Sequence, residues 1–172
     1  VSPKEYFKFA ASLIKEHRRV VNLDHLRLLD VGCAAGDFLK TLYHLQALSQ
    51  EDAIEGSDVI AELLDEARRR LPSVRFFEHN IGRQSLSKIS SNYDIVTMLG
   101  VHSIFDDLDW IENIVSGLSS TGIAIVYGIF NPYPYDVIVR VKQAVSGREW
   151  QPGWNVHSRE AISAYCAHRS IH

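Results

Sequence analysis

Residues suited to ligand binding gather in one stretch, LRLLDVGCAAGDFLKTL, at residues 26–42. A short apolar run reaches Val31, the small residues 32–36 follow, and apolar residues then recur at helical spacing. This order predicts a strand, a tight turn and a helix. Such a turn exposes backbone N–H groups at the start of the helix, and its small side chains let a ligand approach the backbone closely. The stretch therefore predicts a binding site.

The spacing of the small residues separates three classes of ligand. A dinucleotide fingerprint requires G-x-G-x-x-G, but after Gly32 the second and third places hold Ala34 and Asp37. A carboxylate beside a pyrophosphate would also repel it. A phosphate-binding P-loop ends in Gly-Lys-Ser/Thr, which this sequence does not contain. The class that remains is a pocket for S-adenosylmethionine (SAM).

The elements that position this turn follow from periodicity and breakers. An opening helix is expected over residues 3–19, with Ser2 as its N-cap ahead of Pro3. Further helices are expected from the turn to near residue 49, at 60–71 before Pro72, at 108–118, at 136–145 and, behind a Ser158 cap, at 159–167. Strands are expected at residues 28–31, 53–57, 74–77, 93–99 and 123–129. A polar loop is expected at 79–92, a second loop at 131–135 and an aromatic-rich loop at 147–157.

Strands and helices alternate through five rounds, which predicts an α/β fold with a doubly wound parallel sheet and helices on both faces. The run YDIVTML at residues 93–99 is almost continuously apolar, as expected for a central strand covered on both faces. In such a sheet the ligand crevice lies beyond the carboxyl ends of the strands. The turn after Val31 is at that end.

Composition narrows the functional class. The 172 residues, 46% of them apolar, suit a single domain with one core. A formal charge of −3 without a long basic run disfavours nucleic-acid binding, and the triplet Arg68 to Arg70 fits a solvated helix end. Two distant cysteines disfavour disulfides and a cysteine-built metal site. Without a membrane-length apolar run or a signal-peptide pattern, we expect a soluble cytoplasmic protein that binds neither metal nor membrane.

At its first motif the sequence resembles the class I SAM-dependent methyltransferases, and most of all their small-molecule group. That family's motif is an acidic residue, any residue, then Gly-x-Gly-x-Gly, and Asp30, Gly32, Ala34 and Gly36 occupy these places. Alanine replaces the middle glycine, so its methyl group crowds the closest approach of the methionine part of the cofactor. The resemblance implies a Rossmann-like fold.

Three later motifs extend the resemblance. It implies that Asp58 binds the ribose hydroxyls, that Asn80 reads the adenine amino group, and that Leu99 to His102 pass beside the cofactor. Two alternatives stay open: Asp58 also fits an N-cap, and Asn80 equally fits a turn residue. Cys33 fits a small apolar turn residue rather than a nucleophile. The implied cofactor contacts are Asp30, Gly32, Cys33, Ala34, Gly36, Asp58, Val59, Asn80, Ile81, Leu99 and Gly100.

The resemblance also divides the single expected domain, residues 1–172. Residues 1–22 form an N-terminal helix, 26–130 the cofactor-binding core, and 131–172 the loops and helices on the substrate side. The family usually closes its sheet with an antiparallel hairpin of two further strands, and nothing after Ala167 supplies one. We therefore expect a truncated chain, an edge completed by a partner, or a disordered tail.

The function that the resemblance implies is methyl transfer from SAM to a small-molecule acceptor, with S-adenosylhomocysteine (SAH) as product. If the acceptor is a hydroxyl, a general base helps; His102 is the first candidate and His157 the second, although either can simply pack or bind backbone. Aromatic residues in the late loops either wall an acceptor pocket or pack the last helices: Tyr133, Tyr135, Trp150 and Trp154.

Two other functions compete with methyl transfer. One is a SAM-binding or regulatory module that has lost transfer chemistry, and the other is a nicotinamide dehydrogenase, which the glycine spacing disfavours. The acceptor, the atom that is methylated and the oligomeric state stay open, with a homodimer as one candidate.

Overall fold

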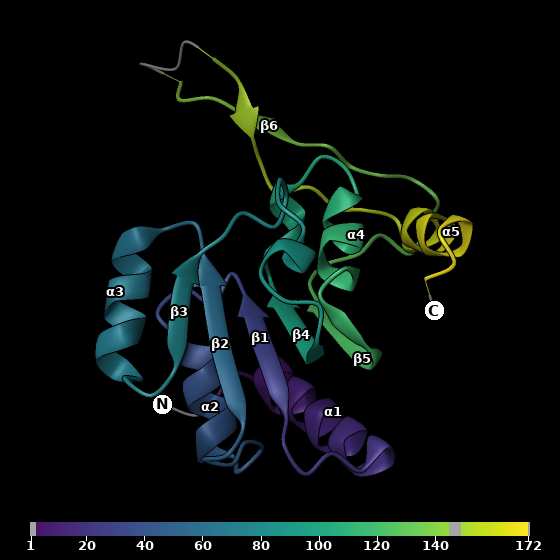
Figure 1. Cartoon of the computed structure of the whole chain (residues 1–172). Helices are drawn as coiled ribbons and strands as arrows, with labels where there is room; N and C mark the ends of the chain where they lie inside the picture. The colour runs from purple at the N-terminus through teal and green to yellow at the C-terminus, as the bar shows by residue number, and fades with distance from the viewer. Residues whose placement is uncertain (1–2, 145–148, 172) are drawn as a thin grey trace.

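A five-stranded parallel sheet lies at the centre of the protein (Figure 1). The computed structural model describes residues 3–144 and 149–171. The strands lie in the order β3-β2-β1-β4-β5, so the predicted doubly wound α/β sheet is confirmed. Strand β4 lies inside the sheet between β1 and β5, as its apolar run predicts. The five strands are β1 Arg27–Val31, β2 Ala53–Asp58, β3 Arg75–Glu78, β4 Tyr93–Leu99 and β5 Leu118–Tyr127.

Helices cover both faces of the sheet because neighbouring strand residues point to opposite sides. Leu28 packs in the cluster formed with α1, α2 and α3, whereas its neighbour Leu29 packs in the cluster formed with α4. None of the described helices is long and apolar enough to cross a membrane. The helices are α1 Glu5–Val21, α2 Asp37–His44, α3 Ala61–Arg70, α4 Asp109–Val115 and α5 Arg159–His168, with short 3-10 turns η1 Leu86–Lys88 and η2 His102–Ile104.

Several boundaries differ from those predicted, and α4 ends at Val115 rather than at residue 118. Helix α1 begins at Glu5 with Lys4 as its N-cap, and Ser2 lies outside the described residues. Helix α2 ends at His44, well before residue 49, because the chain turns into the left-handed region at Gln46 (φ 54°). Strand β5 begins at Leu118 rather than at residue 123, because a shift in its pairing with β4 takes the predicted turn at 121–122 into the strand.

The helix predicted at residues 136–145 is wrong. The described part of this segment is extended: Val137 bridges Val156, and β6 (Arg140–Val141) pairs antiparallel with β7 (Gln151–Pro152). Its run of β-branched residues, VIV at 137–139, favours the extended form. Of the remaining predicted positions, residues 145 and 147–148 lie outside the described residues.

The β6–β7 hairpin projects away from the sheet (Figure 1). A C-terminal antiparallel hairpin is therefore present, but it forms a separate two-stranded sheet, and within the described residues no antiparallel strand pairs with the β5 edge. The hairpin itself was not predicted. The last predicted helix is confirmed as α5, and the hydroxyl of Ser158 accepts a hydrogen bond from the backbone N–H of Ala161 (2.8 Å) as its cap.

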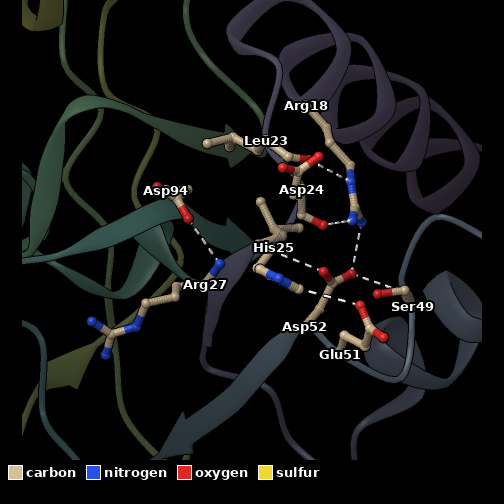
Figure 2. Close-up of polar contacts among 10 residues, drawn as sticks. Arg18, Leu23, Asp24, His25, Arg27, Ser49, Glu51, Asp52 and Asp94 are labelled. Atoms are coloured by element: carbon tan, nitrogen blue, oxygen red, sulfur yellow. Dashed lines mark hydrogen bonds and ion pairs between the residues drawn. The ribbon is translucent and has the colours of Figure 1, made fainter.

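A buried ion pair ties α1 to the loops that precede β1 and β2 (Figure 2). The Asp52 side chain is fully buried and accepts bonds from Arg18 Nη1 (2.8 Å) and from the backbone N–H groups of Leu26 (3.0 Å) and Ser49 (2.7 Å). Arg18 also donates to the carbonyl of Asp24 (2.6 Å). These contacts fix the amino ends of the strands, opposite the end that carries the turn.

Candidate functional site

The turn after β1 is tied to the end of β2. The backbone N–H groups of Gly32 and Cys33 both donate to the carbonyl of Ser57, at 2.8 and 3.0 Å. Gly32 has a φ of +71°, and a Cβ added there would lie 2.3 Å from Cγ2 of Val101. Only glycine therefore fits where the turn crosses the loop after β4.

The acidic residue that ends β2 holds the middle of this turn. Asp58 Oδ2 accepts from the backbone N–H of Ala34 (2.9 Å), and Oδ1 accepts from the backbone N–H of Ile60 (3.0 Å). The second contact is an Asx turn just before α3, whose N-cap is Ile60, so Asp58 does not have the N-cap role considered for it. A carboxylate has about four acceptor positions, so Asp58 retains capacity to bind hydroxyl groups. Ala34 adopts a left-handed conformation (φ 46°), which a glycine adopts at lower cost.

The far side of the turn is held by the last turn of α3. Arg70 donates to the carbonyl of Ala35 (2.8 Å) and to the carboxylate of Asp37 (2.5 Å). Arg68 donates to the carbonyl of Phe76 (3.0 Å). The basic triplet at this helix end is therefore partly used in specific contacts rather than only solvated.

Asp30 lies inside the sheet. Its carboxyl group is buried and accepts a hydrogen bond from the hydroxyl of Thr97 on β4 (2.7 Å). Burial raises the pKa of Asp30 to about 7, and the nearby charge of Asp58 acts in the same direction. The neighbouring Cys33 thiol is also buried, and this burial raises its pKa far above the ordinary value, which is inconsistent with a nucleophile at neutral pH.

A cleft of about 400 Å³ opens at the carboxyl ends of the strands, next to the turn. It brings together six of the predicted cofactor contacts, which are Gly32, Asp58, Val59, Asn80, Ile81 and Gly100. The other five are not among the described residues that line it: Asp30, Cys33, Ala34, Gly36 and Leu99.

The cleft also contains Val101, from the predicted segment 99–102, and seven residues that we did not predict: Val31, Ile60, His79, Gly82, Arg83, Ile104 and Phe105. The first five of these seven lie within two residues of a predicted contact that lines the cleft, so extending each motif along its loop would have found them. Ile104 and Phe105 come from η2 and the residue after it. No motif or apolar period marks this segment in the sequence.

Two residues after β3 form one wall of the cleft. The side-chain oxygen of Asn80 accepts from the backbone N–H of Gly82 (3.1 Å), which is the turn role considered for it. The backbone N–H of His79 donates to the carbonyl of Asp58 (3.1 Å), and its ring is buried. Burial lowers the pKa of His79 and so favours the neutral ring.

Both histidines proposed as general bases are buried against backbone. His102 is 1% exposed, its Nε2 lies 3.3 Å from the carbonyl of Ile129, and its ring stacks on Phe130 at 4.4 Å. His157 is equally buried, and its Nε2 donates to the carbonyl of Phe105 (3.0 Å). Neither histidine is among the described residues lining the cleft. The geometry is that of the packing alternative.

The four aromatic residues expected in an acceptor pocket lie on the surface. Each is between 62% and 78% exposed, so they neither line the cleft nor pack the last helix onto the sheet: Tyr133, Tyr135, Trp150 and Trp154. They are carried by the segment that contains the β6–β7 hairpin.

Comparison with known proteins agrees with this architecture. Trans-aconitate 2-methyltransferase from Rhizobium etli is 29% identical over 133 residues, which are 73% of this chain and 48% of that protein. This chain thus spans about half the length of that curated relative.

Solved structures of methyltransferases share the fold. SAM-bound CalS10, an amino pentose methyltransferase from Micromonospora echinaspora, is 21% identical with a TM-score of 0.63, over 96% of this chain and 83% of that one. The methyltransferase domain of the citrinin polyketide synthase is 20% identical with a TM-score of 0.62, over 73% of this chain and 35% of that one.

The family model described as a methyltransferase domain matches residues 28–122. The match runs from β1 into β5 and contains the turn, Asp58 and the whole lining of the cleft. It covers more than half of the chain, and this chain therefore belongs to the methyltransferase-domain family.

Proposed function

We propose that the protein transfers a methyl group from SAM to a small-molecule acceptor and releases SAH. The observation that carries this proposal is the position of Asp58, which lines the cleft while it holds the turn after β1. A cleft of about 400 Å³ is within the usual range for small-ligand sites. The carboxylate suits a cofactor that is cationic and bears a ribose diol.

The residues fit this cofactor along the cleft. We infer that Asp58 binds the ribose hydroxyls with the acceptor positions that its two backbone bonds leave free. The turn at Gly32 lets the ligand approach the backbone, and residues Asn80 and Ile81 face the adenine part from the opposite wall. The bound cofactor supplies the reactive methyl group on its sulfonium. The chain then contributes alignment and exclusion of water.

The proposed chemistry relies on alignment and not on a general base. His102 and His157 would have to leave the carbonyl groups that they contact before either ring reached an acceptor. A base role for either histidine would therefore require the loops that carry them to rearrange.

A small-molecule acceptor is supported by the relatives, whose names include trans-aconitate and an amino pentose. We propose that the exposed aromatic residues at 133–154 contribute an acceptor-side surface once an acceptor is bound. The net charge of −3 supports a partner other than nucleic acid, and the two free cysteines support a cytoplasmic location.

Isothermal titration calorimetry with SAM and with SAH tests this function. We expect micromolar binding of both, and no binding of NAD, because the turn lacks the dinucleotide spacing. Absence of binding of both SAM and SAH would overturn the proposal. A panel of small carboxylic acids and amino sugars, assayed for SAH release, then separates an active transferase from a module that only binds.

A further inference from the structure

Asn155 joins the projecting segment, which carries the β6–β7 hairpin, to the loop after β4. Its side-chain Nδ2 donates to the carbonyl of Phe105 (2.8 Å) and to Asp106 Oδ1 (2.9 Å), while its Oδ1 accepts from the backbone N–H of Val139 (2.8 Å). Its own backbone N–H donates to the carbonyl of Ser103 (2.6 Å). Asn155 is only 1% exposed, so three hydrogen bonds from one buried residue hold the two segments together, and the bond from Val139 fixes its side chain within its own segment.

His157 and Arg140 make further contacts with the same loop. The carbonyl of Phe105 accepts a second bond from His157 Nε2 (3.0 Å), and Arg140 forms a two-pronged ion pair with Asp106 (3.1 and 2.8 Å). Three side chains of the projecting segment, those of Arg140, Asn155 and His157, therefore bind the loop of residues 103–106. Two of them, Asn155 and His157, converge on one carbonyl oxygen.

The gripped loop is a wall of the cleft. Ile104 and Phe105 both line it. The ring of Phe105 lies against the opposite wall, since a Cβ added to Gly82 would be 2.6 Å from its Cε1. The main chain that carries this ring is fixed at the carbonyl that Asn155 and His157 hold. Movement of that carbonyl would therefore move the ring that spans the cleft.

We propose that Asn155 and His157 are positioning residues, which set the Ile104–Phe105 wall and through it the affinity of the cleft for SAM and SAH. The inference rests on the proposed function for the identity of the ligand. In this proposal His157 positions the carbonyl of Phe105 and does not act as a general base. It also makes the projecting segment part of the cofactor site, although no residue of that segment lines the described cleft.

Hydrogen exchange tests the grip without any ligand. In Asn155→Ala, the backbone N–H groups of Ile104 and Phe105 are expected to exchange about tenfold faster, because two bonds to this loop are lost. The matched control is Asp136→Ala, which removes a bond from the same segment to the backbone N–H of Ser158 and does not touch the loop. Unchanged exchange in Asn155→Ala, or an equal increase in the control, would overturn the inference.

Titration with SAH tests the consequence for binding. His157→Phe keeps a ring but loses the donor, and is expected to weaken SAH about tenfold; His157→Gln keeps an N–H donor and is expected to stay within about threefold of the unmodified chain. Equal losses in the two variants would contradict a role through the carbonyl of Phe105. Thermal unfolding, measured in parallel, identifies any variant that does not fold.

A double-mutant cycle with Phe105→Leu completes the test. If Asn155 acts through Phe105, the double variant Asn155→Ala/Phe105→Leu binds SAH within about twofold of Phe105→Leu alone. Additive losses, with normal binding by the unmodified chain, would overturn this inference and leave the proposed function standing. Failure of the unmodified chain to bind SAM or SAH would instead overturn the proposed function.

Discussion

The backbone N–H of Ala34 lies 2.9 Å from Oδ2 of Asp58, so the middle of the small-residue turn is held by the residue that ends β2. The same carboxylate accepts a bond from the backbone N–H of Ile60, just before α3, and lines the cleft. One side chain thus serves the fold and the proposed site together. A loss of cofactor affinity at Asp58 is informative only when the stability of the variant is measured as well.

Asp58→Ala is expected to lose both functions. Removing an acceptor from two backbone N–H groups lowers the free energy of unfolding by about 2 to 4 kcal/mol, and loss of the ribose contacts weakens SAH by about 1.5 to 3 kcal/mol. Urea denaturation and calorimetry measure the two effects. Asp58→Asn keeps a side-chain oxygen, so we expect a smaller loss of stability with most of the loss in affinity. Unchanged SAH affinity in both variants would show that Asp58 only holds the backbone of the turn.

Ala34→Gly is expected to raise the free energy of unfolding by about 0.5 to 1 kcal/mol. The left-handed conformation at Ala34 (φ 46°) costs a residue with a Cβ about 1 to 2 kcal/mol, and the greater freedom of glycine in the unfolded chain offsets part of the gain. Ala35→Gly is the control, since Ala35 has no positive φ and should lose stability. If both variants lose stability equally, the turn is not strained at Ala34.

The parallel sheet follows from the sequence because apolar runs and helical periods are local patterns. The bounds of strands β1 to β4 accordingly lie close to those that the patterns predict. The segment at 136–141 shows the limit of that reasoning. Apolar residues there occur at helical spacing, but the extended form is stabilised by contacts with residues 151–156, which are distant in sequence.

In the candidate site, too, some residues can be predicted from the sequence and others cannot. Asp58 and Gly32 are predictable because a motif places them at strand ends on one edge of the sheet. Phe105 is not, because its place in the cleft depends on the carbonyl that Asn155 and His157 hold, and no spacing in the sequence relates residue 105 to residues 155 and 157. The burial of His102 under Gly128 is likewise a tertiary contact, since a Cβ at Gly128 would overlap the ring.

Asp52→Ala is expected to lower the free energy of unfolding by about 3 to 5 kcal/mol and to leave SAH affinity unchanged in the folded protein. Its side chain is fully buried, and its removal leaves the Arg18 guanidinium without its carboxylate partner. Chemical denaturation measures the loss. Arg19→Ala is the control, because its pair with Glu16 is exposed and contributes little. A loss below 1 kcal/mol would contradict the role assigned to this ion pair.

A further consequence of this pair is sensitivity to acid. Burial acts to raise the pKa of Asp52, but bonds from the backbone of Ser49 and Leu26 and from Arg18 hold that pKa below its ordinary value. The stabilisation is therefore present above the pKa of an unfolded aspartate and is lost as the pH falls through the lower folded value. Asp52→Ala should accordingly show a flatter decline in stability below pH 4 than the unmodified chain.

Asp30 should produce the opposite dependence on pH. Its pKa is raised by burial to about 7, whereas an unfolded aspartate titrates near 4. Between these values the folded state binds the proton that the unfolded state has released, so stability falls as the pH rises, by up to about 1.4 kcal/mol per unit, and levels off above pH 7. Asp30→Asn keeps an acceptor for the Thr97 hydroxyl but cannot ionise. The measurement is the difference in unfolding free energy between this variant and the unmodified chain, taken by urea denaturation at pH 5, 6, 7 and 8. The buried histidines are present in both proteins, so their contribution cancels in this difference. We expect the difference to grow in favour of Asp30→Asn up to pH 7, and a constant difference would show that Asp30 is ionised throughout this range.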